Sequence, residues 1–167
     1  MTNVSVKELF LGEFDREMAT TRKILERVPF EKFDWMPHAK SMPLGRLANH
    51  VATLPRFVPN VIDTTKFEIV RTGPLDVKST ADIVAAFDGL ARTAREALVA
   101  TTDEHLAGEW EMSFGDRQLF KGTRAAAFQS LFMDHLIHHR AQLGVYLWLN
   151  DVAIPGSYGP SADEPMA

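Results

Sequence analysis

The sequence contains no cysteine among its 167 residues. This excludes disulfide bonds, cysteine-ligated zinc sites and a cysteine nucleophile, and it is compatible with a reducing cytoplasm. The sequence also lacks an apolar run of about 18 residues, so it offers no candidate for a membrane-spanning helix. The first residues show no basic segment followed by a long apolar one. We therefore expect no signal peptide, no membrane partner and a cytoplasmic location.

Basic residues are too few and too scattered to predict a nucleic-acid-binding surface. Lysine and arginine number 18 against 22 acidic residues, which gives a formal net charge of -4. Binding to phosphates needs concentrated positive charge, so we expect no nucleic-acid partner. The length fits one domain over residues 1–167. Proline, glycine and serine are frequent after about residue 150, which predicts an irregular C-terminal tail.

Apolar residues recur at helical spacing in four segments. These predicted helices cover about residues 6–28, 41–61, 79–98 and 123–149. Ser5, Ser41 and Ser79 are candidate N-caps. Pro55 and Pro59 each remove a backbone donor, which predicts a bend in the second helix near Leu54. Four amphipathic helices favour an all-α fold, an up-down-up-down four-helix bundle.

Two connecting segments have extended character. Trp110, Met112 and Phe114 alternate with polar residues and are followed by a Gly115-Asp116 turn, which predicts a short hairpin before the last helix. The stretch from Phe67 to Val70 is also apolar enough to be extended, although we expect residues 63–78 to be a connection.

Three histidines are expected to point into the same core. His135 and His139 are four residues apart on the predicted last helix, so they share a face. Steps of three and four residues from Phe128 along the apolar stripe reach both of them. The same steps from Leu47 place His50 on the apolar stripe of the second helix.

A shared metal ion would bind the acceptor nitrogen of each of these three rings. A neutral imidazole has one donor and one acceptor nitrogen, and each unpaired buried group costs about 1–3 kcal/mol. Zinc on three histidines, with a fourth position open, is a familiar catalytic arrangement. The pattern therefore predicts one divalent metal ion on His50, His135 and His139. The spacing alone leaves open the alternative of histidines that are merely hydrogen-bonded or on the surface.

The other histidines are expected to lie outside this site. His138 is turned about 100° from His139 around the helix, which places it at the flank of the site. His105 lies in a polar stretch and is expected to be exposed. His38, in the loop before the second helix, has either a structural role or a place at the mouth of the site.

A hydrolytic site would need a general base beside the metal. The candidates are Asp134, Glu13 and Glu17. Asp134 points about 100° away from its ligand neighbour. Glu13 and Glu17 are expected to form the solvated edge of the first helix. The base is therefore unassigned.

Two segments carry a resemblance to a known family. Trp35–Leu44, followed by His50, resembles the entry to the second helix of the DinB/YfiT-like metal-binding bundles. Asp134–Leu143 resembles the last helix of that family, where a histidine, three residues and a second histidine precede Arg, a small residue and Gln or Glu. The tail Ile154–Glu164 is similar to the endings of the family. The sequence departs from the family at Ala141, where glycine is usual, and in its proline pair.

The resemblance implies a metal site and a chemistry. It implies that His50, His135 and His139 are the ligands, and that the metal activates a small thiol for S-transfer to an electrophile. The alternatives are a metal-dependent hydrolase of a small substrate and a non-catalytic metal- or ligand-binding stress protein. Imidazoles suit zinc, nickel, copper and iron; we expect zinc or nickel, with iron as a third option. The resemblance also implies a homodimer and a small-molecule partner, such as a low-molecular-weight thiol.

Overall fold

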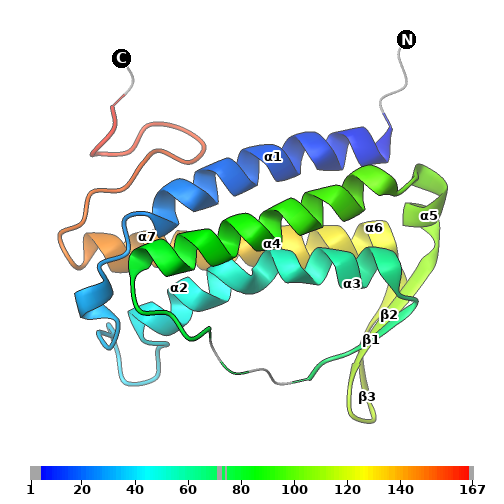
Figure 1. The fold of residues 1–167 in the computed structure, drawn as a ribbon, viewed down its shortest axis with the longest axis horizontal. Helices are drawn as coiled ribbons and strands as arrows, with labels where there is room; N and C mark the ends of the chain where they lie inside the picture. The colour runs from blue at the N-terminus through cyan, green and yellow to red at the C-terminus, as the bar shows by residue number, and fades with distance from the viewer. Residues whose placement is uncertain (1–4, 71–72, 74, 166–167) are drawn as a thin grey trace.

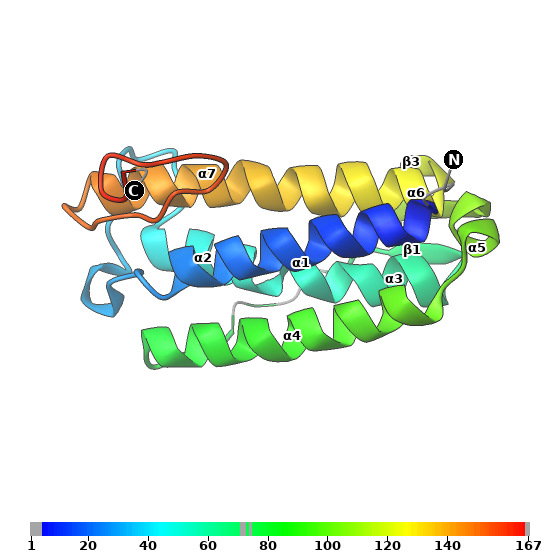
Figure 2. The same ribbon diagram turned by 90° about the horizontal axis from the view of Figure 1, so that it is seen from above.

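The structure is a computed structural model that describes residues 5–70, 73 and 75–165. Two single helices and two composite helical rods lie side by side along the long axis of the molecule (Figure 1; Figure 2). The helical elements are α1 (Val6–Leu25), η1 (Phe30–Lys32), α2 (Leu44–Thr53), η2 (Leu54–Arg56), α3 (Phe57–Asp63), α4 (Thr80–Ala100), α5 (Asp103–Ala107), α6 (Arg124–Ala127), η3 (Phe128–Met133) and α7 (Asp134–Trp148).

Local side-chain chemistry sets several helix ends. Ser5 forms a capping box with Glu8 at the start of α1, and the Ser79 hydroxyl accepts from a backbone N–H at the start of α4. The predicted cap at Ser41 is wrong, because α2 begins after Pro43 without a side-chain cap. The backbone of Ser41 is instead bonded to the carbonyl of His38 in a turn.

The second rod is interrupted where the prolines predicted a bend. After α2, the 3₁₀ turn η2 contains Pro55, and α3 follows it. Proline has no N–H for the α-helical bond, so the chain tightens locally and then continues. A 3₁₀ turn therefore interrupts the rod just beyond His50.

The predicted all-α four-helix bundle is wrong, because a three-stranded mixed sheet lies at one end of the helices (Figure 1). Its strands are β1 (Lys66–Glu68), β2 (Glu109–Phe114) and β3 (Arg117–Thr123). β2 and β3 form the expected hairpin, which turns at Gly115 with a φ of 55°. β1 pairs parallel with β2, from a segment that the sequence presented as a connection.

The sheet has its own small core. Trp110 and Met112 project from β2 and pack with Val61 and Ala127, which lie on the helices that the sheet covers. The indole N–H of Trp110 donates to the carbonyl of Asn60. Because side chains alternate along a strand, Trp110 and Met112 share the face of the sheet that packs on the helices. This apolar face buries Val61 and Ala127.

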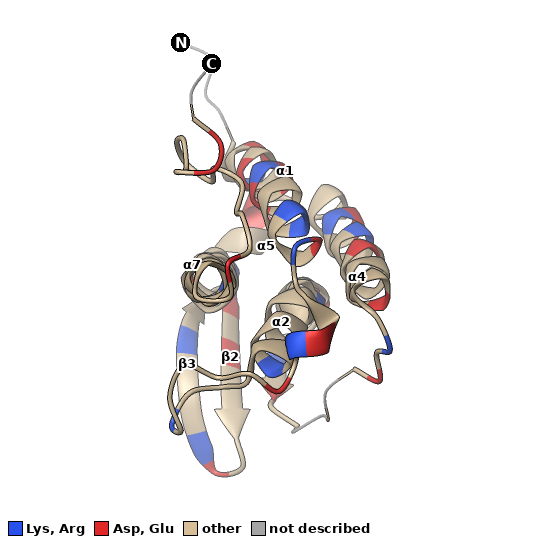
Figure 3. Cartoon of the chain, turned by 90° about the vertical axis from the view of Figure 1, so that its left-hand side faces the viewer, with Lys and Arg blue, Asp and Glu red and all other residues tan. Residues whose placement is uncertain are grey.

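Charged residues of both signs lie along α1 and α4 (Figure 3). Two ion pairs join these helices, Arg22 with Asp88 and Arg95 with Asp15. None of the helices in the described part of the chain is both long and apolar enough to cross a membrane. After α7, residues 152–165 follow without a helix or strand and fold back over α7 (Figure 2).

Candidate metal site

Three histidine rings from two helical rods converge in the structure. One ring nitrogen from each of His50, His135 and His139 lies within 4.8 Å of the others. The Nε2 atoms of His50 and His135 are 3.0 Å apart. The ring centroid of His139 lies 4.6 Å from that of His50 and 4.7 Å from that of His135. The predicted convergence of the three rings is therefore found.

The rings lie at the edge of the core rather than on its central stripe. All three are half-buried, while the buried side of α7 runs through Leu136 and Arg140. The reason is the π-helical turn η3, in which the N–H of Asp134 bonds to the carbonyl of Gln129, five residues back. This wider turn changes the phase of α7, and such turns are frequent at functional sites.

Two cavities meet at the histidine group. The larger cavity, of about 660 Å³, lies between α2 and two other segments, the one that follows η1 and the one that precedes α4. The smaller cavity, of about 350 Å³, lies between the second rod and the sheet. Both are lined by His50, Thr53 and Arg56, and His135 lines the smaller one. Both cavities therefore give access to His50, and the smaller one also gives access to His135.

A glutamine fixes the orientation of one ring. The Nδ1 of His139 donates to the Oε1 of Gln142 over 2.7 Å, which leaves its Nε2 free to bind a cation. This is the usual way in which a partner sets the tautomer and orientation of a metal-binding histidine. From the sequence, Gln142 was identified only as part of the family pattern in the last helix and was given no role. Its spacing of three residues from His139 is the signal that could have assigned this role.

We expect Gln142→Leu to weaken metal binding by roughly 10–100-fold, the usual effect of losing such a partner. Gln142→Glu should keep most of the affinity, because a carboxylate accepts the same hydrogen bond. Competition with a chromogenic zinc chelator measures both constants. Equal affinities for Gln142→Leu and the unchanged protein would show that Gln142 does not orient the ring.

The donor set fits a divalent transition metal. Two nitrogen ligands on a tetrahedral zinc lie about 3.3 Å apart, given bonds of about 2.0–2.1 Å. The 3.0 Å separation of the two Nε2 atoms is close to that value. The group contains three imidazoles and no carboxylate, a set that suits zinc, nickel, copper and iron rather than calcium or magnesium.

Comparison with known proteins places the chain in a family. The sequence profile of the DinB family matches residues 1–165. The chain belongs to the DinB family. A DinB-like protein from Bacillus cereus shares 24% identity, with 89% of this chain and 95% of that chain covered and a TM-score of 0.69. One from Bacillus subtilis shares 22%, with coverages of 89% and 97% and a TM-score of 0.68. These two likenesses show the DinB fold alone. No curated protein matches the sequence.

Two imidazoles of the histidine group in this DinB protein, those of His50 and His135, have lowered pKa values, which favours their neutral form. Burial lowers the pKa of His50 to about 4, and the charges of His139, His135, Arg56 and Arg46 add to the effect. Burial also lowers the pKa of His135, although a hydrogen bond to the backbone of Leu131 opposes this. Neutral rings keep a lone pair for a cation at pH 7.

We expect the metal-free protein to lose stability as the pH falls from about 6.5 towards 4. In this window an unfolded chain protonates His50, whose ordinary pKa is 6.5, while the folded state keeps it neutral. The contribution is complete above pH 6.5 and is lost as the pH falls towards the folded-state pKa. Melting temperatures from pH 4 to 7.5 should fall less steeply in His50→Gln, and identical slopes would contradict the prediction.

The remaining histidines lie outside the group. His138 is exposed, although its ring centroid is 4.9 Å from that of His139. His38 is exposed in the loop before α2, where its Nδ1 accepts from the backbone of Lys40. His105 is exposed, as predicted, and its Nε2 lies 2.7 Å from the carbonyl oxygen of Ile62 near the end of α3. Of these three, only His138 has a ring beside the site.

The candidate bases do not join the group either. Asp134 is exposed and accepts from Gln129. The prediction of a solvated edge is wrong for Glu17, which is 4% exposed and lies 2.6 Å from a guanidinium nitrogen of Arg140. The phenol of Tyr158 donates to the same carboxylate and accepts from Arg140. The buried arginine on α7 needs this counter-charge, so the acid turns inward.

Proposed function

We propose that this DinB protein binds one divalent metal ion on His50, His135 and His139 and acts as a metal-dependent enzyme, activating a small thiol for S-transfer to an electrophile. One observation carries the proposal: three half-buried imidazoles, without a carboxylate, meet where two cavities join. A purely structural metal site is normally closed by four protein ligands, whereas a catalytic one keeps a position open.

The absence of a carboxylate from the histidine group favours a thiol over water as the nucleophile. A divalent cation on neutral imidazoles lowers the pKa of a bound thiol well below its free value of about 8.5. The proton then goes to solvent, and no side-chain base is required. A sulfur lone pair forms the new C–S bond while the leaving group departs with its bonding electrons. A hydrolase would need a positioned base, and Asp34, the one described acid that lines either cavity, is not in the histidine group.

The nitrogen ligands support zinc or nickel as the metal, with iron as a third option. We further propose a homodimer, supported by the family membership and by exposed apolar side chains near the end of α7, at Val145 and Leu149. A cytoplasmic location is supported by the lack of cysteine.

The test is metal analysis of the purified protein followed by a thiol-transfer assay. Glutathione, coenzyme A and cysteine are each mixed with 1-chloro-2,4-dinitrobenzene, and release of chloride and formation of the coloured thioether are followed. We expect turnover with at least one thiol, its loss on chelation and its return with zinc. Loss of thermal stability on chelation with no turnover would indicate a structural metal, and a metal-free protein in zinc-containing buffer would overturn the proposal altogether.

A further inference from the structure

The two cavities have different linings although they share the histidine junction. The described charged residues of the larger cavity are two arginines, Arg46 and Arg56, and one acid, Asp34. Arg56 also lines the smaller cavity, which has no described acid. Most of the smaller cavity is apolar, with walls that include Leu54, Phe57, Phe67, Ile69, Met112 and Leu131. A molecule that fills both cavities therefore meets positive charge at one end and hydrocarbon at the other.

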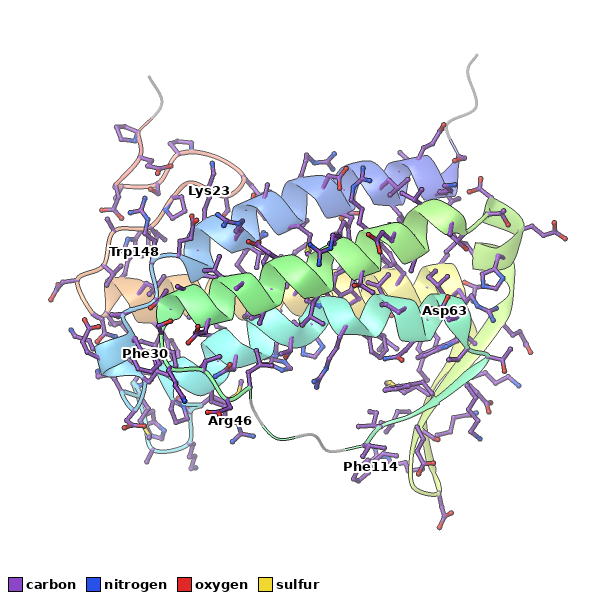
Figure 4. The ribbon with its side chains drawn as sticks, viewed as in Figure 1. Lys23, Phe30, Arg46, Asp63, Phe114 and Trp148 are labelled. Atoms are coloured by element: carbon purple, nitrogen blue, oxygen red, sulfur yellow. The ribbon has the colours of Figure 1, made fainter. Side chains whose placement is uncertain are left out.

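Helical spacing places the arginines beside the histidine. Arg46, His50 and Thr53 follow one another at steps of four and three residues, so they share one face of α2. Arg56 continues this face through η2. Figure 4 shows Arg46 on the side of α2 where the larger cavity lies, whose lining also includes Leu75 and Val77 from the segment before α4. Both arginines lie close enough to His50 for their charge to act on its ring.

Arg46 is available to a ligand. It is exposed, and it makes no hydrogen bond or ion pair with any residue that the structure describes. A guanidinium presents several N–H donors in a planar fork that matches a carboxylate or phosphate. The protein as a whole has a formal net charge of -4, whereas arginines outnumber acids among the described residues that line the larger cavity. This local positive charge favours binding of an anion.

We propose that an organic substrate of this protein is an amphipathic oxyanion, whose carboxylate or phosphate binds Arg46 and Arg56 and whose apolar body occupies the smaller cavity. A substrate bound in this way would span the histidine group and hold its reacting atom beside the metal. That part of the inference rests on the proposed function. The smaller cavity has room for an aromatic ring or a short acyl chain.

The test compares two probes that share a phenylbutyl body and differ in their head group, the anion 4-phenylbutyrate and the neutral alcohol 4-phenylbutan-1-ol, by calorimetric titration. The proteins are the unchanged chain, Arg46→Gln, the double variant Arg46→Gln/Arg56→Gln and the control Arg92→Gln, whose exposed arginine on α4 is not among the described lining residues. We expect the unchanged chain and the control to bind the carboxylate about 10-fold or more tightly than the alcohol. The double variant should bind the two within about threefold, with its affinity for the alcohol unchanged, and Arg46→Gln should fall between.

A metal ion could itself bind the carboxylate, so each titration is repeated on His135→Ala and on chelator-treated protein. The inference requires that the preference survives without metal and disappears without the arginines. It is overturned if the unchanged chain shows no preference, if the preference persists in the double variant, or if the preference is lost with the metal. Failure of zinc binding or of thiol transfer would count against the proposed function, while the carboxylate preference would stand or fall by these titrations alone.

Discussion

His135→Ala is expected to lose stoichiometric metal binding while keeping its fold. The variant removes one of three nitrogen ligands, and its effect should exceed the roughly 10–100-fold cost of losing only a supporting partner. The ring is half-buried at the edge of the core, so truncation leaves a space that the cavity already adjoins. Equilibrium dialysis against zinc or nickel with elemental analysis measures the loss, and circular dichroism reports the helices.

His138→Ala is the matched control for this experiment. Its ring lies on the same helix beside His139 but is exposed and outside the cluster. It should therefore retain one metal ion per chain. Stoichiometric metal in His135→Ala, or equal loss in both variants, would refute the assigned ligand set.

Glu17→Ala is expected to destabilise the protein by about 3–5 kcal/mol, because it leaves the guanidinium of Arg140 buried without its counter-charge. Arg140 is 3% exposed, and its other acceptors are neutral oxygens: the carbonyl of Glu17 and the hydroxyls of Thr21 and Tyr158. Urea denaturation followed by tryptophan fluorescence measures the free energy of unfolding.

Two further variants test whether the loss of stability comes from the unpaired charge of Arg140. Glu13→Ala, one turn earlier on α1, should change the free energy of unfolding by no more than about 0.5 kcal/mol. The double variant Glu17→Leu/Arg140→Met should regain most of the stability, since apolar residues often replace a buried ion pair at little cost. A loss in the double variant as large as in Glu17→Ala would show that packing, rather than the unpaired charge, explains the effect.

Local features of the fold were predictable from the sequence, and the pairing of distant strands was not. Ser5 and Ser79 cap helices where expected because a cap depends on residues three apart. The β2–β3 hairpin follows from alternation and a Gly-Asp turn. The three residues of β1 carry too short a pattern, and their parallel pairing with β2 depends on a partner more than 40 positions away. The all-α prediction failed at that long-range contact.

The same distinction applies to the site. The histidine spacing predicted which rings meet, because helical periodicity and an apolar stripe determine the direction of side chains. The two cavities were not predictable, since their walls come from the segment after η1, from α2, from the segment before α4 and from the sheet. Glu17 was misassigned because its burial depends on Arg140, which lies on another helix. The pattern of a single sequence can place a residue on one face of a helix, but it cannot show which side chains of the neighbouring helix or strand that face contacts.

The π-helical turn from Phe128 to Met133 gives the rod one residue more than an ordinary α-helical turn needs for the same rotation. Loss of one residue there would convert the wide turn into an α-helical one and leave the two ends of the rod close to their present relative rotation. Ala127 would keep its place beneath the sheet, and His135 and His139 would still face His50. A one-residue deletion within these six residues should therefore disturb the histidine group less than a deletion between His135 and His139, which would rotate the two rings by about 100° relative to each other.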